Sequence, residues 1–130
     1  MKKILVADVP QMDERYSAAF TGWEVAFART LAQAHQALDA GSCAVVVTGV
    51  YFDDSRMFDL VRALRSGEAH REVPIVCVRG CQGFTAVTTR TLELTVGALA
   101  ANDFLDLAQF GDVEAGNAAL RAAVQRFLGD

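Results

Sequence analysis

The chain has 130 residues, of which 52% are hydrophobic and 22% are charged, and only two are prolines. This size and composition fit one globular domain over residues 1–130 and exclude a disordered chain. The formal net charge of −4 argues against nucleic acid or an anionic membrane surface as a partner. No apolar run approaches the ~20 residues of a membrane-spanning helix. Asp8 interrupts the apolar start too early for a signal peptide, so we expect a cytoplasmic protein.

Two kinds of apolar pattern alternate along the chain: runs of about five residues, typical of strands, and longer segments with helical spacing. In chain order, they predict a strand at 3–7, a helix at 12–20, a strand at 23–28, a helix at 30–40, a strand at 44–48, a helix at 57–65, a strand at 74–78, a helix at 84–100, a strand at 103–107 and a helix at 112–128. Thr30 and Asp112 stand where they can cap two of these helices.

Strict alternation of strands and helices predicts a parallel sheet with helices on both faces. Continuous apolar runs are typical of strands that are covered on both faces, and here they are 3–7, 44–48 and 74–78. Alternating runs suit edge strands, and here they are 23–28 and 103–107. The predicted fold class is therefore α/β, a three-layer α/β/α sandwich around a doubly wound five-stranded parallel sheet with strand order 2-1-3-4-5.

A doubly wound sheet places its site at the carboxyl ends of the strands where the winding direction reverses. Here these are the first and third strands. Asp8 follows the first strand, and Thr48 or Gly49 ends the third. Two further carboxylates, Asp53 and Asp54, follow the third strand a few residues later. These residues are the candidates for a functional site.

The three cysteines indicate free thiols, because an odd number in a short chain does not suit a disulfide framework. Cys43 and Cys77 lie in or beside strand-like runs, where small apolar side chains are common. Cys77 and Cys81 are four residues apart on a predicted strand and loop, and His35 and His70 are distant in sequence. Zinc sites pair closely spaced ligands, so we expect no metal site.

Five segments of this sequence have the hydrophobic pattern, order and spacing of one known family: "KKILVAD", "GWEVAFARTLAQAHQAL", "MFDLVRALR", "VPIVCV" and "AANDFLDL". Over essentially its whole length the chain resembles the receiver domains of two-component response regulators. The resemblance implies a flavodoxin-like (CheY-like) fold and a role in signal transduction.

Receivers that accept a phosphoryl group need a defined set of polar residues. Two adjacent acids after strand 1 help to hold Mg²⁺, an aspartate ending strand 3 is the acceptor, a Thr or Ser ends strand 4, and a lysine ends strand 5. Carboxylates suit Mg²⁺, and cations stabilise a phosphoryl group in transfer. Asp8 matches the first acid only. The other positions hold, in order, Val9, Thr48 or Gly49, Arg79 and Leu107.

The resemblance therefore implies a pseudo-receiver, which is not an enzyme, uses no cofactor or metal, and acts by protein–protein interaction without phosphorylation. Because the sequence ends with the last predicted helix, we expect no output domain of its own. The surface implied for a protein partner, or for a homodimer, comprises helix 84–99, strand 103–107 and helix 112–128.

Two other functions stay open at this stage. One is a phosphorylatable receiver of a phosphorelay that uses Asp53 or Asp54 as a displaced acceptor. Thr48 as the acceptor would need a general base and a kinase of another type. The other is a small ligand-binding or enzymatic protein on the same fold, because a fold alone does not fix a function.

Arg79 supports a separate hypothesis. At the end of strand 4 it could pair with Asp8 or Asp54 and supply a fixed positive charge where a metal ion and a lysine would act. The alternative is an exposed loop arginine in a surface ion pair worth about 0–1 kcal/mol.

Overall fold

The structure is a computed structural model that describes residues 3–41, 43–80 and 86–128. Its elements follow the predicted order: β1 (Lys3–Ala7), η1 (Pro10–Met12), α1 (Asp13–Ala19), β2 (Glu24–Ala28), α2 (Leu31–Asp39), β3 (Cys43–Gly49), α3 (Phe52–Ser55), α4 (Met57–Ser66), β4 (Ile75–Arg79), α5 (Ala86–Ala98), β5 (Asp103–Asp106), η2 (Leu107–Gln109) and α6 (Val113–Leu128). Cys81 and the predicted start of the helix at 84–100 lie outside the described residues.

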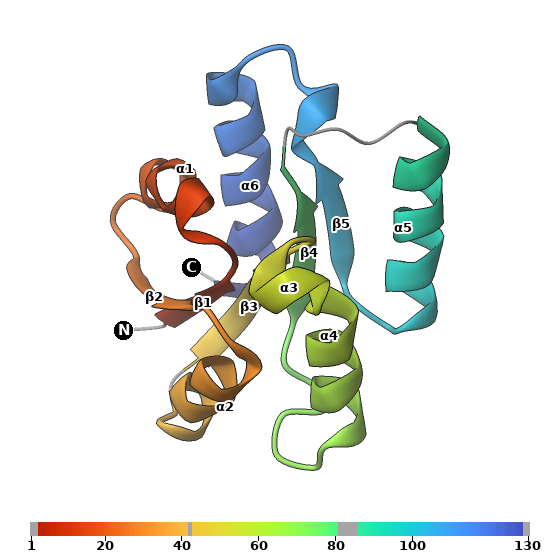
Figure 1. Ribbon diagram of the computed structural model, residues 1–130. Helices are drawn as coiled ribbons and strands as arrows, with labels where there is room; N and C mark the ends of the chain where they lie inside the picture. The colour runs from red at the N-terminus through yellow and green to blue at the C-terminus, as the bar shows by residue number, and fades with distance from the viewer. Residues whose placement is uncertain (1–2, 42, 81–85, 129–130) are drawn as a thin grey trace.

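The five strands form one parallel sheet in the order β2-β1-β3-β4-β5, which confirms the predicted order (Figure 1). Ala7 pairs with Thr48, Gly49 pairs with Val78, and Arg79 pairs with Asp106. This register brings the carboxyl ends of β1, β3, β4 and β5 to one edge of the sheet. We call this edge the carboxyl edge.

Helices cover both faces of the sheet and bury two separate apolar cores. One core joins the sheet to α1 and α6, and the other joins it to α2, α4 and α5 (Figure 1). Successive strand residues point to opposite faces, so Val46 lies in the second core and Val47 in the first. We call these the α1/α6 face and the α2/α4 face. This alternation decides which side chains meet at the carboxyl edge.

Two helix caps agree with the sequence pattern. The Thr30 hydroxyl accepts a hydrogen bond from the amide of Gln33 at 3.1 Å, and the Asp112 carboxylate accepts one from the amide of Ala115 at 2.8 Å. Each satisfies an amide that the first turn of a helix leaves without a partner, a contribution of about 1 kcal/mol.

Candidate functional site

Asp8, directly after β1, is the central polar group of the carboxyl edge. Its side chain is buried, and its oxygens accept hydrogen bonds from the Tyr16 hydroxyl at 2.6 Å and from the Val9 amide at 2.7 Å. Burial raises the pKa of Asp8 above its ordinary value of 3.8, although these bonds and the nearby Arg29 charge oppose the shift. Burial, together with the charge of Asp8, raises the pKa of Tyr16 well above 10.0.

Gly49, the last residue of β3, lies against this carboxyl group. A Cβ atom built on Gly49 would overlap all three atoms of the Asp8 carboxyl group, well inside the 3.0 Å that real Cβ atoms keep. The Asp8 carboxyl group therefore fills the space in which any side chain at position 49 would begin. Of the two residues that the sequence offers at the end of strand 3, Gly49 is the one beside Asp8.

Thr48 points to the opposite face of the sheet, because it alternates with Val47 and Gly49 along β3. Its side chain is fully buried, and its hydroxyl oxygen has no hydrogen-bond partner among the described residues. The structure thus separates Thr48 from Asp8. A buried hydroxyl without a partner costs stability, by about 1–3 kcal/mol.

We expect Thr48→Val to stabilise the fold by about 1 kcal/mol, because valine has nearly the same shape and no hydroxyl to desolvate. Urea denaturation followed by circular dichroism measures the change. Thr30→Val is the matched control with the opposite sign, since it removes a helix cap and should cost about 1 kcal/mol. A loss of stability in Thr48→Val would contradict the prediction.

Asp8→Asn should stabilise the fold increasingly as the pH rises. The raised pKa means that the folded state favours protonated Asp8, so the wild type loses stability as the pH rises from 3.8 through the raised pKa. Asparagine stays neutral over this window, and its advantage over the wild type should therefore grow toward neutral pH. Unfolding free energies measured across the window test this. A constant difference, equal to that of the exposed control Asp54→Asn, would contradict it.

Arg29 supplies the positive charge next to Asp8. Its Nη1 atom donates a hydrogen bond to the backbone oxygen of Asp8 at 3.0 Å, and its guanidinium group also pairs with the Asp13 carboxylate. The guanidinium lies over the Phe27 ring, 5.3 Å from its centroid. Sequence reasoning missed Arg29 and Tyr16. The predicted strand order contained a signal for Arg29, since it directly follows the strand that neighbours strand 1.

The residues at the carboxyl edge do not fit the Mg²⁺ ion that the family resemblance would imply. Val9 offers no side-chain oxygen, Gly49 has no side chain, and both Asp8 oxygens already accept hydrogen bonds. Arg29 holds the position of a cation between Asp8 and Asp13. Within residues 3–41, 43–80 and 86–128, no three His, Cys, Asp or Glu side chains gather closely enough to hold a metal ion.

Arg79 pairs with Asp106, so both sequence-based hypotheses about Arg79 are wrong. Arg79 Nη1 donates to Asp106 Oδ1 at 2.7 Å, and the two side chains are 5% and 6% exposed. Asp106 Oδ1 also accepts a hydrogen bond from the Ala108 amide at 3.0 Å. The register places Arg79 beside Asp106, and alternation turns both toward the α2/α4 face, away from Asp8. The result is a buried ion pair between β4 and β5, not a surface pair.

Asp53 and Asp54 lie in a left-handed turn after β3. Asp53, Asp54 and Ser55 have φ angles of 46°, 56° and 65°. The Asp53 carboxylate accepts a hydrogen bond from the Leu31 amide at 2.9 Å, at the start of α2, and Asp54 is exposed. Left-handed residues other than glycine cost about 1–2 kcal/mol each, less for aspartate, and the bond to α2 offsets part of this cost.

Comparisons with known proteins agree with this architecture. The chain superposes with a TM-score of 0.72 on the signal receiver domain of a histidine kinase from Syntrophus aciditrophicus, at 19% identity over 98% of this chain and 90% of that one. The superposition on a chemotaxis response regulator of Vibrio cholerae has a TM-score of 0.70 at 18% identity, and it covers 94% of this chain and 98% of that one. The superposition on a response regulator from Thermotoga maritima has a TM-score of 0.73 at 16% identity, and it covers 100% of this chain and 99% of that one. The chain has the receiver fold.

Sequence comparison adds no relative to this structural likeness: no family model matches the chain, and no curated protein sequence matches it. Within the receiver fold, Leu107 occupies the position after β5 where the family resemblance implies a lysine. Its side chain is 2% exposed and packs in the core of the α1/α6 face. Lys3 lies at the other end of the sheet, where its Nζ atom is 3.8 Å from Glu24 Oε2.

Two cavities lie at opposite ends of this receiver fold. The carboxyl-edge cavity, of about 460 Å³, is lined by Asp8, Val9, Gln11, Met12, Arg15, Val50, Tyr51 and Gly80. Thr48, Asp53, Asp54, Arg79 and Leu107 are not among the residues that line it. The structure therefore brings only Asp8 and Val9, of the sequence-predicted site residues, to this cavity, with Gly49 behind the Asp8 carboxyl group.

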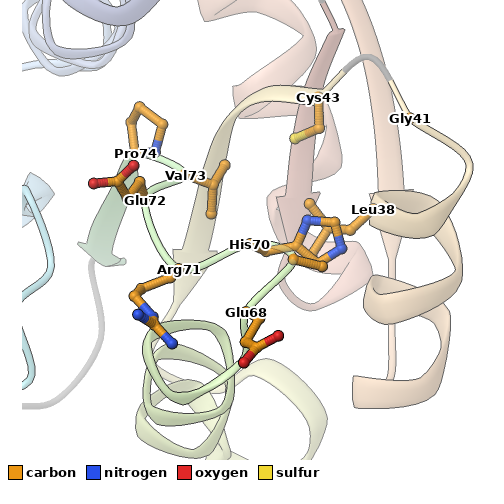
Figure 2. Close-up of a pocket in the computed structure, with 10 residues that line it drawn as sticks. Leu38, Gly41, Cys43, Glu68, His70, Arg71, Glu72, Val73 and Pro74 are labelled. Carbon is orange, nitrogen blue, oxygen red and sulfur yellow. The ribbon is translucent and has the colours of Figure 1, made fainter.

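The amino-edge cavity, of about 740 Å³, lies at the other end of the sheet. Figure 2 shows that its residues come from the end of α2, the start of β3 and the loop before β4. His70 in this loop contacts the Asp39 carboxylate of α2 at 3.1 Å. Arg65 donates hydrogen bonds to the backbone oxygens of Arg71 and Val73 at 2.8 and 2.7 Å, which hold the loop in place. The charged residues that line the amino-edge cavity are both acidic and basic, so they indicate no particular ligand.

Proposed function

We propose that this protein is a pseudo-receiver: a signalling module that acts by protein–protein interaction and does not accept a phosphoryl group. The fit between Gly49 and Asp8 carries the proposal. Phosphoryl transfer on this fold requires a carboxylate at the end of β3. That position has no side chain, and its space holds a carboxyl group already bound to Tyr16.

The rest of the charge pattern supports the same function. A lysine after β5 would neutralise the phosphoryl group, and that position holds buried Leu107. A hydroxyl residue after β4 would bond to a phosphoryl oxygen, and Arg79 is instead bonded to Asp106 on the other face. Arg29 occupies the place of a cation beside Asp8. At the two positions where the family resemblance implies a lysine and a hydroxyl, the described residues therefore offer no such group to a transferring phosphoryl group.

The alternative function is a phosphorylatable receiver in which Asp53, in the turn after β3, is a displaced acceptor. Its carboxylate is half-buried and bonded to the Leu31 amide, and neither Asp53 nor Asp54 lines the carboxyl-edge cavity. Modification there would release the start of α2, because a phosphorylated carboxylate oxygen is a weaker acceptor.

The test is incubation with acetyl phosphate and Mg²⁺, read by intact mass spectrometry. We expect no added phosphoryl group under conditions that fully modify a phosphorylatable receiver treated in parallel. An adduct that disappears in Asp53→Asn or in Asp54→Asn would overturn the proposal and establish the displaced acceptor. An adduct that survives both substitutions would overturn it as well and direct attention to Thr48.

We further propose that a protein partner, or a second copy of the chain, binds in the cytoplasm over α5, β5 and α6. Two exposed apolar side chains support this surface: Leu94 on α5 is 61% exposed, and Val113 on α6 is 57% exposed. No described helix is both long and apolar enough to cross a bilayer.

Affinity capture should lose a bound protein in Leu94→Asp and Val113→Asp but keep it in Phe27→Asp on β2. Equal capture by all three would contradict this surface.

A further inference from the structure

Residues 53–55 form a left-handed turn in the loop that joins β3 to α4. The φ angles of Asp53, Asp54 and Ser55 are 46°, 56° and 65°, although none of the three is a glycine. Left-handed backbone is unfavourable for residues that have a Cβ atom, and outside glycine it is normally found in single residues. Three such residues in succession therefore store strain, which other contacts have to offset.

The strain is confined to a short segment with a buried side chain at each end. Phe52 is fully buried and Met57 is 2% exposed, and both pack in the core of the α2/α4 face. Tyr51 and Arg56 lie at the two junctions, with φ/ψ angles of −90°/5° and −100°/24°, in the sparsely populated bridge region of backbone conformation. A few residues at such junctions can absorb a change of backbone direction while the buried side chains stay in place.

One carboxylate holds this turn against α2. Asp53 accepts a hydrogen bond from the Leu31 amide at 2.9 Å. This amide belongs to the first turn of α2, where amides have no partner within the helix, and the carboxylate also places a negative charge at the positive end of the helix dipole. Asp54 and Ser55 are exposed and add no apolar burial to the turn. The bond between Asp53 and Leu31 is therefore the contact that opposes the strain.

We propose that residues 53–55 are a latch with two states. In the closed state, which is the one observed, the bond from Leu31 to Asp53 holds the left-handed turn. In the open state this bond is broken, residues 53–55 leave the left-handed region, and the first turn of α2 loses its cap. Opening also changes the direction of the chain just after Val50, which lines the carboxyl-edge cavity.

The latch connects α2 with the carboxyl edge of the sheet. A partner that binds one of the two states more tightly would shift the equilibrium toward that state. The latch does not depend on the proposed function, since it requires neither a phosphoryl group nor the surface on α5, β5 and α6.

NMR chemical-exchange saturation transfer measures the latch in the wild-type protein. Because a single hydrogen bond opposes the strain, we expect an open state with a population on the order of 1%. Residues 51–57 and 31–33 should exchange at one common rate, and the minor-state ¹³C shifts of Asp54 and Ser55 should no longer be those of left-handed backbone. Absence of exchange in both segments would overturn the proposal.

Substitutions of Asp53 test the hydrogen bond. Asp53→Ala removes the acceptor and should raise the open population at least about tenfold. Asp53→Asn keeps an acceptor oxygen and tolerates left-handed backbone as aspartate does, so it should raise the open population much less than Asp53→Ala. An open population that is the same in Asp53→Ala as in the wild type would contradict the latch.

Substitutions of Asp54 test the strain, and the expected signs are opposite. Asp54→Gly should lower the open population about fivefold, because glycine adopts left-handed backbone without a steric penalty. Asp54→Ala should raise it, because alanine tolerates this region less well than aspartate. Position 54 is exposed, so both variants should fold even if Asp53→Ala does not. Equal open populations in the two variants, or the reverse order, would overturn the proposal.

Asp59, in the regular first turn of α4, is the matched control position. There glycine should give the less stable protein and alanine the more stable one, as in any ordinary helix. Neither Asp59→Gly nor Asp59→Ala should change the open population of the latch. A change as large as that in Asp54→Gly would show that the exchange reports general loosening of α4, which would contradict a latch at residues 53–55.

Discussion

Gly49→Ala is expected to destabilise this protein by about 3 kcal/mol, although alanine ordinarily favours a strand over glycine by about 0.5–1 kcal/mol. The reason is steric: the new methyl group and the Asp8 carboxyl group would occupy one space. Asp8 would have to leave it and break its hydrogen bond with Tyr16, which would leave a buried hydroxyl without its partner.

A double-mutant cycle isolates this clash. Asp8→Ala alone should cost stability, because the Tyr16 hydroxyl loses its acceptor. In the Asp8→Ala background, Gly49→Ala should be neutral or stabilising, which gives a coupling free energy of about 2–3 kcal/mol. Chemical denaturation of the four proteins measures it. If the two substitutions were additive, the Asp8 carboxyl group would not be what excludes a side chain at position 49.

Arg79→Met and Asp106→Ala are each expected to cost about 3–5 kcal/mol, the largest effects of any single substitutions considered. Each removes one partner of a pair whose side chains are only 5% and 6% exposed, and with it the compensation which that partner gives to the other buried charge. The loss should appear in the free energy of unfolding, with full retention of the receiver fold at low temperature. The exposed pair of Arg62 and Asp59, at 3.2 Å, is the control: Arg62→Met should cost less than about 1 kcal/mol.

The double variant Arg79→Met/Asp106→Asn should recover most of that loss. It leaves no buried charge, and asparagine keeps an oxygen that can accept the hydrogen bond from Ala108. If the double variant lost as much free energy of unfolding as the two single variants together, the two side chains would not act as a pair. The same measurement separates the observed pair from a pairing with Asp8, because Asp8→Asn would then stabilise Arg79→Met by more than it stabilises the wild type.

The sheet could be predicted from the sequence because a strand that is buried on both faces has a continuous run of apolar residues. The continuous apolar runs of β1, β3 and β4 belong to the central strands, and the end of each run places Asp8, Gly49 and Arg79 at the carboxyl edge. The caps at Thr30 and Asp112 were readable for a similar reason, since a cap depends on residues within one turn.

The partners of the site residues could not be predicted in this way. Arg79 bonds with Asp106 and not with Asp8, because strand register and the alternation of faces decide the pairing, and these require atomic spacing between strands. The same holds for Tyr16, which reaches Asp8 only because α1 packs against one particular face. An uncertainty of one residue at the end of strand 3 was enough to leave Thr48 and Gly49 undecided, although they point to opposite faces.

The Asp8 carboxyl group in the space beside Gly49 also constrains how this protein can evolve. Any single substitution at position 49, including one to aspartate, meets the occupied space and would cost stability before it could confer a new activity. Substitution of Asp8 first by a residue small enough to free this space would leave Tyr16 without its acceptor. Every path of single steps to a carboxylate at position 49 therefore passes through a less stable protein. In evolutionary terms the pair is a stability barrier to any carboxylate at position 49.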